Sequence, residues 1–292
     1  MKDKVVSIDE AKHLVKDGDL VATGGLTIHR KPMAFIYEII RSKFKKLRII
    51  SFGGGPEIDL MVAAGCVEKV DAAYVGFEIL GFAPNFRKAI EEKQIEYTEH
   101  TEYSIMVGLQ ATMLGLEFSP CKVPAKIIRE SDVHRRLDLK SVKSPYTGEE
   151  LMAYPPIRPD VAIIHLQRSD NFGNAHMEGV TAIDDLLIKA SKKVILTVEE
   201  IIPSSEIMKE PSKTKVSPSF VDAIVKIPYG AHPTSCYPFY AYDLWHLREI
   251  MEKTKAGDIQ AYLNDYIFGV RTFDDYLSKI GDSALSKIKP KR

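Results

Sequence analysis

A short apolar run that ends in two glycines and leads into a helical pattern constrains this 292-residue chain more than any other feature. Leu20–Thr23 is apolar and β-branched, which is typical of a buried strand. Gly24 and Gly25 interrupt it, and glycine allows positive φ or a close approach of backbone to a ligand. Pro32 suits the first turn of a helix, and apolar residues recur at helical spacing from Met33. The pattern predicts a strand, a tight turn and a helix.

Such a turn leaves backbone N–H groups that suit a phosphate, a carboxylate or an oxyanion. A purely steric role for the two glycines is the alternative. If the turn binds a substrate oxygen, Gly25→Val is expected to abolish activity more than it harms folding. The β-branched side chain would fill the space that the oxygen needs.

The same alternation recurs along the chain and predicts further strands and helices. The expected strands are Leu47–Phe52, Ala72–Phe77, Ile95–Thr98, Val161–Leu166, Val194–Val198 and Val221–Ile227. The capping box Ser7–Glu10 is expected to open one helix. Further helices are expected at Glu57–Ala64, Pro84–Lys93, Tyr103–Leu114 and Ile183–Ala190. This rhythm predicts an α/β fold: an open, mainly parallel, doubly wound sheet with helices on both faces. No linker separates the segments, so one domain over residues 1–292 is expected.

Polar residues gather where the predicted strands end. In open α/β sheets, ligands bind beyond the carboxyl ends of the strands, where the glycine-rich turns also fall. The polar residues at these ends are Thr27, His29, Arg30, Glu99, Glu102, Glu199, Glu200 and His232. Each has a structural alternative, such as a carboxylate at a helix N-terminus or a histidine bonded within its own turn.

Between Glu117 and Asp160 the α/β pattern lapses, and prolines punctuate the chain. Lys143–Gly148 has the composition of a hairpin turn. A long irregular segment is uncommon in a compact domain, so we expect either a substrate-covering or partner-contacting segment, or a packed excursion.

Composition and missing motifs exclude several classes of function. The formal net charge is zero, which gives no basic field for nucleic acid. No apolar run reaches membrane-helix length, no signal peptide is recognisable, and three cysteines without Cys-x-x-Cys spacing indicate neither disulfides nor zinc. The dinucleotide, P-loop, His-Glu-x-x-His and Gly-x-Ser-x-Gly motifs are absent. A cytoplasmic protein without a metal site is expected.

Several motifs together resemble the A subunit of family I CoA-transferases, most nearly the glutaconate CoA-transferase type. They are Gly24–Pro32, Asp160–His165, Val198–Ile202, Val221–Val225 and Pro228–Pro233. The resemblance implies an obligate B subunit in a hetero-oligomer of A2B2 or larger, with the active site at the interface. It places the nucleophilic glutamate on the B subunit. It also implies acyl-CoA and carboxylate substrates, coenzyme A entering as acyl-CoA, and no permanently bound cofactor.

The resemblance also implies which residues of this chain form the site. The turn after the first strand would supply backbone donors for an oxyanion, and the residues after it would contact the substrate. The set is Gly24, Gly25, Leu26, Thr27, Ile28, His29, Arg30, Gly53 and Gly54.

One position departs from the transferase pattern. CoA-dependent ring-opening hydrolases of late steroid-ring catabolites share the fold and resemble this chain at Arg30–Phe35, Gly108–Gln110 and Ser144–Tyr146. They carry a catalytic glutamate at the position of Glu102, where the glutaconate type carries an amide. If this chain is part of a hydrolase, Glu102 is expected to be buried near Phe82 or Met106 and to act as a general base.

Three functions therefore stay open: the A chain of a CoA-transferase, which the motifs favour, the A chain of a ring-opening hydrolase, and a non-catalytic acyl-CoA binder. A B-type neighbour with the nucleophilic glutamate would favour transfer. For the transferase, the chain alone is expected to be inactive and to expose an apolar face that the B subunit covers.

Overall fold

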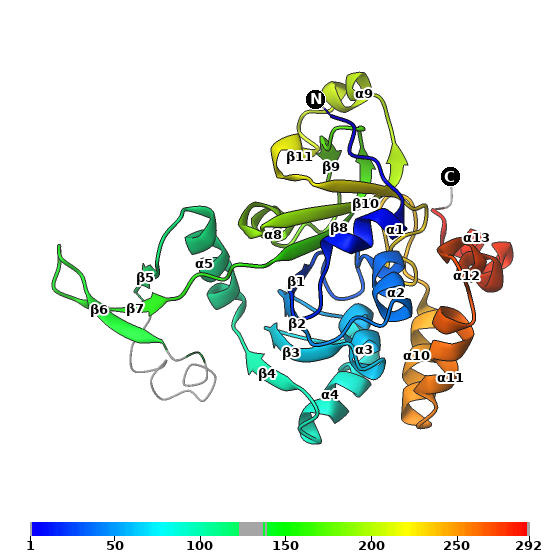
Figure 1. Cartoon of the computed structure of the whole chain (residues 1–292), viewed down its shortest axis with the longest axis horizontal. Helices are drawn as coiled ribbons and strands as arrows, with labels where there is room; N and C mark the ends of the chain where they lie inside the picture. The colour runs from blue at the N-terminus through cyan, green and yellow to red at the C-terminus, as the bar shows by residue number, and fades with distance from the viewer. Residues whose placement is uncertain (1, 123–136, 138, 291–292) are drawn as a thin grey trace.

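A mainly parallel sheet of nine strands forms the body of the protein (Figure 1). The computed structural model describes residues 2–122, 137 and 139–290. The strands are β1 (Leu20–Thr23), β2 (Leu47–Ser51), β3 (Val67–Ala72), β4 (Glu96–Glu99), β8 (Val161–Ser169), β9 (Ala175–His176), β10 (Lys193–Ile201), β11 (Thr214–Val216) and β12 (Ala223–Lys226). The order β12-β10-β8-β1-β2-β3-β4 is parallel throughout, and β9 and β11 add an antiparallel extension beside β8.

Helices cover both faces of this sheet, as the sequence predicted. They are α1 (Ile8–Ala11), α2 (Met33–Arg41), α3 (Pro56–Ala63), α4 (Pro84–Glu91), α5 (Glu102–Met113), α8 (Asp184–Ala190), α9 (Ser204–Lys209), α10 (Leu244–Lys255), α11 (Ile259–Leu263), α12 (Phe273–Ile280) and α13 (Asp282–Ile288). Short turns of tighter or wider helix occupy Lys12–Leu14, Glu78–Leu80, Pro218–Phe220 and Asn264–Phe268. Figure 1 shows α2, α3, α10 and α11 on one side of the strands and α5 and α8 on the other.

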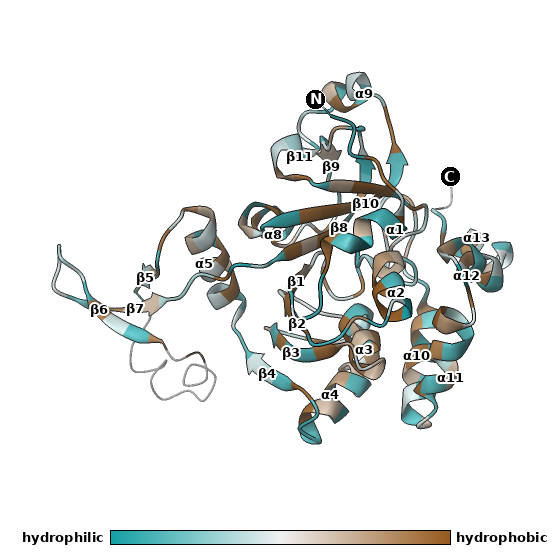
Figure 2. Cartoon of the chain, in the orientation of Figure 1, coloured by the Kyte–Doolittle hydropathy of each residue, from teal (hydrophilic) through white to brown (hydrophobic). Residues whose placement is uncertain are grey.

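The alternation of side chains along β8 shows why both faces must be covered. Val161 and Ile163 belong to one apolar core, whereas Ala162 and Ile164 belong to a second one. Successive residues of a strand point to opposite faces, so a strand that is apolar at every position needs a layer on each side. Figure 2 shows the apolar colouring concentrated along β8 and β10.

The predicted third strand lies in the wrong place. The strand is β3, and the sequence prediction of Ala72–Phe77 overlaps it at one residue only. β3 is half-buried: Val67 and Val70 face the core, while Glu68 is exposed. The apolar residues after it instead run along the carboxyl edge of the sheet, where Gly54 N–H donates to the Tyr74 carbonyl.

The segment without α/β pattern contains a small antiparallel sheet. Its strands are β5 (Ser119–Cys121), β6 (Lys140–Lys143) and β7 (Glu150–Tyr154), in the order β5-β7-β6. The predicted turn joins β6 to β7, which confirms the hairpin. Figure 1 shows this sheet projecting from the body beyond α5. Within the described residues, no helix has the length and apolar character to span a membrane.

Candidate active site

The Gly24–Gly25 turn differs from the sequence expectation in its hydrogen bonding. Gly24 N–H donates to the Ile163 carbonyl at 3.0 Å, and Gly25 N–H donates to Asp184 Oδ1 at 2.9 Å. These two donors are therefore not free for a ligand in this structure. Gly25 has a φ of +73°, and a Cβ there would lie 2.3 Å from the carbonyl oxygen of His29. The space beside Gly25 is filled by the chain itself.

Two other backbone donors of the predicted set are left over. Among the described residues, the N–H groups of Ile28 and Gly53 have no hydrogen-bond acceptor, and both residues are buried. The Thr27 N–H donates to the Gly53 carbonyl at 2.9 Å, which holds the two loops together. A buried N–H without a partner costs free energy, so such donors are suited to a ligand oxygen. Ile28 and Gly53 are thus members of the predicted set whose backbone donors are available to a ligand.

The two cations after the turn are buried in ion pairs. Arg30 is 2% exposed, lies 2.8 Å from Asp184 Oδ2, and donates to the backbone carbonyls of His165 and Val180. Lys31 is fully buried, with Nζ 2.8 Å from Glu57 Oε1. Breaking a buried ion pair leaves an uncompensated charge, which is costly. These two pairs therefore stabilise the turn, and their cations are not available to bind a substrate. The Arg30 guanidinium is fully used by contacts within the protein, so only the Arg30 backbone could contact a substrate.

His29, Ser235 and Glu78 form a polar cluster beside the turn, at the carboxyl edge of the sheet. His29 Nδ1 is 2.7 Å from Ser235 Oγ, and its Nε2 is 3.4 Å from Glu78 Oε1. The Thr27 hydroxyl donates to the same Glu78 oxygen. Burial lowers the pKa of His29 below its ordinary value, while the Glu78 carboxylate acts in the opposite direction. The arrangement allows His29 to exchange a proton with a group at this edge.

Glu78 is a candidate that the sequence reasoning missed. It follows β3 in a short helical turn and adopts a φ of +53°. Thr27 also has positive φ, at +50°. Non-glycine residues in this region are uncommon and cluster at functional sites. Nothing in the residue types around Glu78 signals this conformation.

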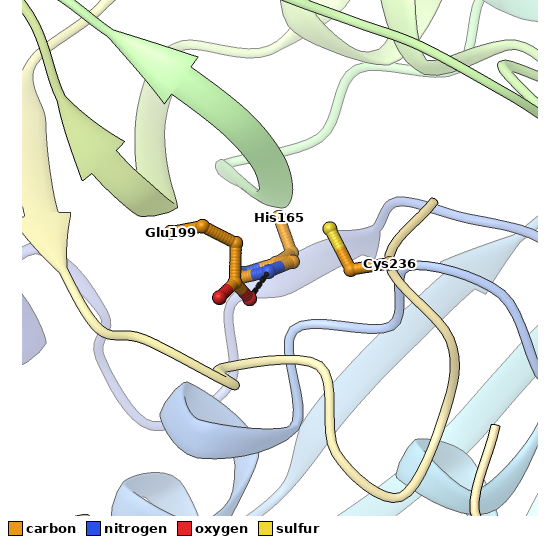
Figure 3. Close-up of side chains that lie close together, drawn as sticks. All are labelled: His165, Glu199 and Cys236. Atoms are coloured by element: carbon orange, nitrogen blue, oxygen red, sulfur yellow. Dashed lines mark hydrogen bonds and ion pairs between the residues drawn. The ribbon is translucent and has the colours of Figure 1, made fainter. Parts of the chain in front are cut away.

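A second buried group involves His165, Glu199 and Cys236 (Figure 3). Their ligand atoms lie within 4.8 Å of one another, which is close enough to hold a metal ion. However, His165 Nε2 is 2.8 Å from Glu199 Oε1 and its Nδ1 is 2.9 Å from Thr197 Oγ1. Burial raises the pKa of the Cys236 thiol well above its usual value, which disfavours the thiolate that a metal requires. These contacts describe a satisfied core network.

The Glu199 carboxylate connects this network to the loop after β12. It accepts hydrogen bonds from the Tyr240 hydroxyl at 2.6 Å and from the Tyr229 N–H at 2.7 Å. His232, in the same loop, is also buried, with Nδ1 2.6 Å from the Tyr276 hydroxyl. Both predicted strand-end residues therefore hold the loop in place, and neither lies free at the edge.

The remaining acidic candidates are more accessible. Glu102 is the first residue of α5, behind the cap Thr101, and it is exposed in this chain. The expected burial against Phe82 or Met106 is therefore wrong for the chain by itself. Glu99 is exposed at the end of β4, and Glu200 pairs with Arg168 at 2.8 Å. The structure does not gather these carboxylates with His29.

The sequence from residue 5 to residue 226 matches the coenzyme A transferase family. A relative from Acidaminococcus fermentans, the A subunit of glutaconate CoA-transferase, is 31% identical over 98% of this chain and 94% of its own length. The chain belongs to the coenzyme A transferase family. The crystal structure of the Acidaminococcus enzyme superposes with a TM-score of 0.91 over 99% of this chain and 96% of that chain. The predicted family, fold and enzyme class are thereby confirmed.

Other relatives show how widely this family varies. The cholesterol ring-cleaving hydrolase IpdA subunit of Mycobacterium tuberculosis is 32% identical over 98% of this chain and 100% of its own length. An uncharacterized protein of Archaeoglobus fulgidus is 36% identical over 97% of this chain, and the chain spans 63% of that protein's length. Named transferase and hydrolase subunits are thus about equally similar to this chain. Identity alone does not separate the two reactions.

Proposed function

We propose that this chain is the A subunit of a two-chain CoA-transferase that moves CoA between an acyl-CoA and a carboxylic acid. The observation that carries the proposal is the match to glutaconate CoA-transferase over nearly the whole of both chains. The family uses covalent catalysis, in which a nucleophile splits one difficult exchange into easier thioester steps. We place that nucleophile, a glutamate, on a B subunit in a hetero-oligomer of A2B2 or larger.

The role proposed for this chain is to stabilise the oxyanion and to hold the substrate. The unpartnered N–H groups of Ile28 and Gly53 supply the donors, and Thr27 and His29 contact the substrate. Removing one oxyanion donor typically lowers a rate by about 10²–10³. Gly24 and Gly25 support the same site from behind, because their own N–H groups are engaged.

The test is thioester exchange by the purified chain with and without a B-type subunit. Short-chain and dicarboxylic acyl-CoAs serve as donors, and hydroxylamine or borohydride traps a glutamyl-CoA adduct on the B subunit. We expect exchange and the adduct only when both chains are present. Robust thioester exchange by this chain alone would contradict the proposal. Tight acyl-CoA binding without turnover, in the absence of any B-type partner, would instead favour a non-catalytic binder.

A role in a ring-opening hydrolase is the second candidate, and the position of Glu102 after β4, at the carboxyl edge of the sheet, favours it, whereas the burial expected of a general base is absent in this chain by itself. A carboxylate at the carboxyl edge of the sheet is placed to act as a general base on water or substrate. In a hydrolase, Glu102→Gln is expected to lower the rate by about 10²–10⁴ with little change in binding. In a transferase the same change should be mild, costing only the helix N-terminal interaction of about 0.3–1 kcal/mol.

The matched control for this comparison is Glu99→Gln, an exposed carboxylate at the end of the neighbouring strand. Hydrolysis and exchange are measured for both variants in the same two-chain complex. A collapse of hydrolysis in Glu102→Gln but not in Glu99→Gln, with no trapped adduct in the unaltered complex, decides for the hydrolase.

A further inference from the structure

A cavity of about 870 Å³ opens beside the proposed site. The turn after β1 contributes His29 to its wall, and the loop after β12 contributes Ser235 and several aromatic or apolar side chains. The segment at the end of α13 forms another part of the wall. The lining that matters here is Val180, Ser235, Tyr237, Tyr242, Ile288 and Lys289. A volume of this size is near the upper end of the range of pockets for drug-sized ligands, which are mostly apolar with a few polar groups.

Hydrogen bonds among the walls show that the cavity is built into the fold. The buried Gln167 side chain donates to the backbone carbonyls of Glu178 and Tyr237 and accepts from the Glu178 N–H. Gly179 takes a φ of +76° and lies against Tyr237, because a Cβ on Gly179 would be 3.4 Å from the Tyr237 Cβ and 3.5 Å from the Tyr237 ring. The Ala241 N–H donates to the Ile288 carbonyl at 2.8 Å, which attaches the C-terminal wall. A pocket held in this way loses little entropy when a ligand enters.

The charges around the cavity differ between its walls. Lys287 and Lys289 lie on the C-terminal wall, and neither forms an ion pair with any described residue. On the wall from the turn, the Arg30 charge is neutralised by Asp184. Burial lowers the pKa of His29, and the Glu178 carboxylate that also lines the cavity pairs with Lys213 at 3.1 Å. An anionic group would therefore bind at the two lysines and an apolar one between the walls.

We propose that this cavity holds the acyl group of the substrate, and that this group is large, apolar and carries a second carboxylate, which Lys287 and Lys289 bind. The inference rests on the proposed function, because it places the reacting end of the acid at His29, next to the proposed oxyanion donors. A five-carbon diacid would leave most of the space empty. A chain of about a dozen carbons, or fused rings of similar size, fits the volume and the apolar lining.

Calorimetric titration of the purified full chain with three acids tests the proposal without requiring turnover. The acids are dodecanedioic acid, 12-hydroxydodecanoic acid, which lacks the second carboxylate, and glutaric acid, which lacks the length. We expect dodecanedioic acid to bind at least about tenfold more tightly than either of the others. Lys287→Glu with Lys289→Glu should remove its advantage over the hydroxy acid. Ala241→Trp, which fills the cavity, should weaken both long acids by about tenfold or more.

The matched control is Lys43→Glu with Lys46→Glu, two exposed lysines between α2 and β2 at the other end of the strands. Its affinities should equal those of the unaltered chain. Equal binding of the two long acids to the unaltered chain, or equal binding of glutaric acid, overturns the proposal. So does displacement of dodecanedioic acid by coenzyme A alone. If the expected preferences appear but no acyl-CoA supports exchange in the two-chain complex, the proposed function fails while the acid site stands.

Discussion

At the scale of single residues, buried charges and one glycine with positive φ determine the shape of the turn after β1. Arg30 and Lys31 are neighbours in sequence, yet they reach different acids, Asp184 and Glu57. The Glu57 carboxylate also accepts from the Gly55 N–H at 2.9 Å, so the two glycine-rich loops share one buried network. Charges buried in this way are retained only when each is paired and hydrogen-bonded. The turn is thus rigid before any ligand arrives.

Gly25→Ala tests the steric role of this glycine. The added Cβ would lie 2.3 Å from the His29 carbonyl oxygen and 2.7 Å from Arg30 backbone atoms, at positive φ. We expect the free energy of unfolding, measured with urea, to fall by several kcal/mol, about 3 or more. Gly18→Ala is the matched control, because Gly18 has a similar φ of +82° and nothing within 4 Å of the new Cβ. It should cost only about 1 kcal/mol.

This expectation replaces the sequence-based one, in which substitution at Gly25 would spare folding. Full stability of Gly25→Ala, together with lost activity, would restore the view that a substrate oxygen occupies this space. Sequence alone could not make the distinction, because it placed glycines at a turn without showing which atoms face them.

At the scale of the elements, strands and helices were predictable where burial and periodicity agree. β8 and β10 are apolar on both faces, and glycine or proline ends several of the predicted elements, so their positions came out within a few residues. β3 was misplaced because its pattern is half-polar. β9 and β11 are too short to leave a pattern of their own. The conformation of Glu78 and the contacts of His29 depend on distant segments, which local patterns do not encode.

Three of the C-terminal helices, α10, α11 and α12, meet at a buried polar cluster around His246. His246 Nε2 is 2.8 Å from the Tyr262 hydroxyl, and the N-cap Asp243 accepts from the His246 N–H. The rings of His232 and His246 lie 5.4 Å apart. Burial lowers the pKa of His246 to about 3, with the proximity of His232 adding to the effect and Asp243 opposing it.

This shift predicts a loss of stability in acid. Because the folded pKa lies below the ordinary value of 6.5, the unfolded chain binds the proton first. His246 therefore does not change the free energy of unfolding above pH 6.5. It lowers that free energy as the pH falls from 6.5 toward 3. Between pH 7.5 and pH 5 the loss attributable to this residue should be about 1–2 kcal/mol.

The measurement is urea unfolding at both pH values for the unaltered chain, His246→Gln and the exposed control His13→Gln. We expect a smaller acid loss in His246→Gln and an unchanged one in His13→Gln. Burial also raises the pKa of Asp59 to about 6, which stabilises the folded state on acidification through the same range. Because Asp59 is present in all three proteins, its contribution is the same in each and drops out of the comparison. Identical pH dependence in all three proteins would contradict the assignment.

At the scale of the whole molecule, the carboxyl edge of the sheet combines the proposed site with exposed apolar side chains. Ile79 and Phe82 follow β3 and are 75% and 66% exposed, and Tyr103 follows β4. Neighbouring apolar side chains left in water next to a site are typical of a surface that a partner covers. The resemblance predicted such a face but not its residues. That the chain forms one domain over residues 1–292, and that it works in the cytoplasm, stay predictions.

The last prediction concerns assembly with the B subunit proposed above. Phe82→Asp places a charge within the exposed apolar group at the sheet edge, so it should weaken the complex by at least about tenfold, since burying an unpaired charge at an interface is costly. Met208→Asp is the matched control, because Met208 is 71% exposed on α9, which follows β10, a strand separated from β3 by three others. Binding of the B subunit is measured by titration, and the circular dichroism and melting of each variant establish that it is folded. We expect only Phe82→Asp to lose affinity. Equal affinity of both variants and the unaltered chain would show that the partner binds another face, and loss in Met208→Asp alone would move the interface to the α9 end of the molecule.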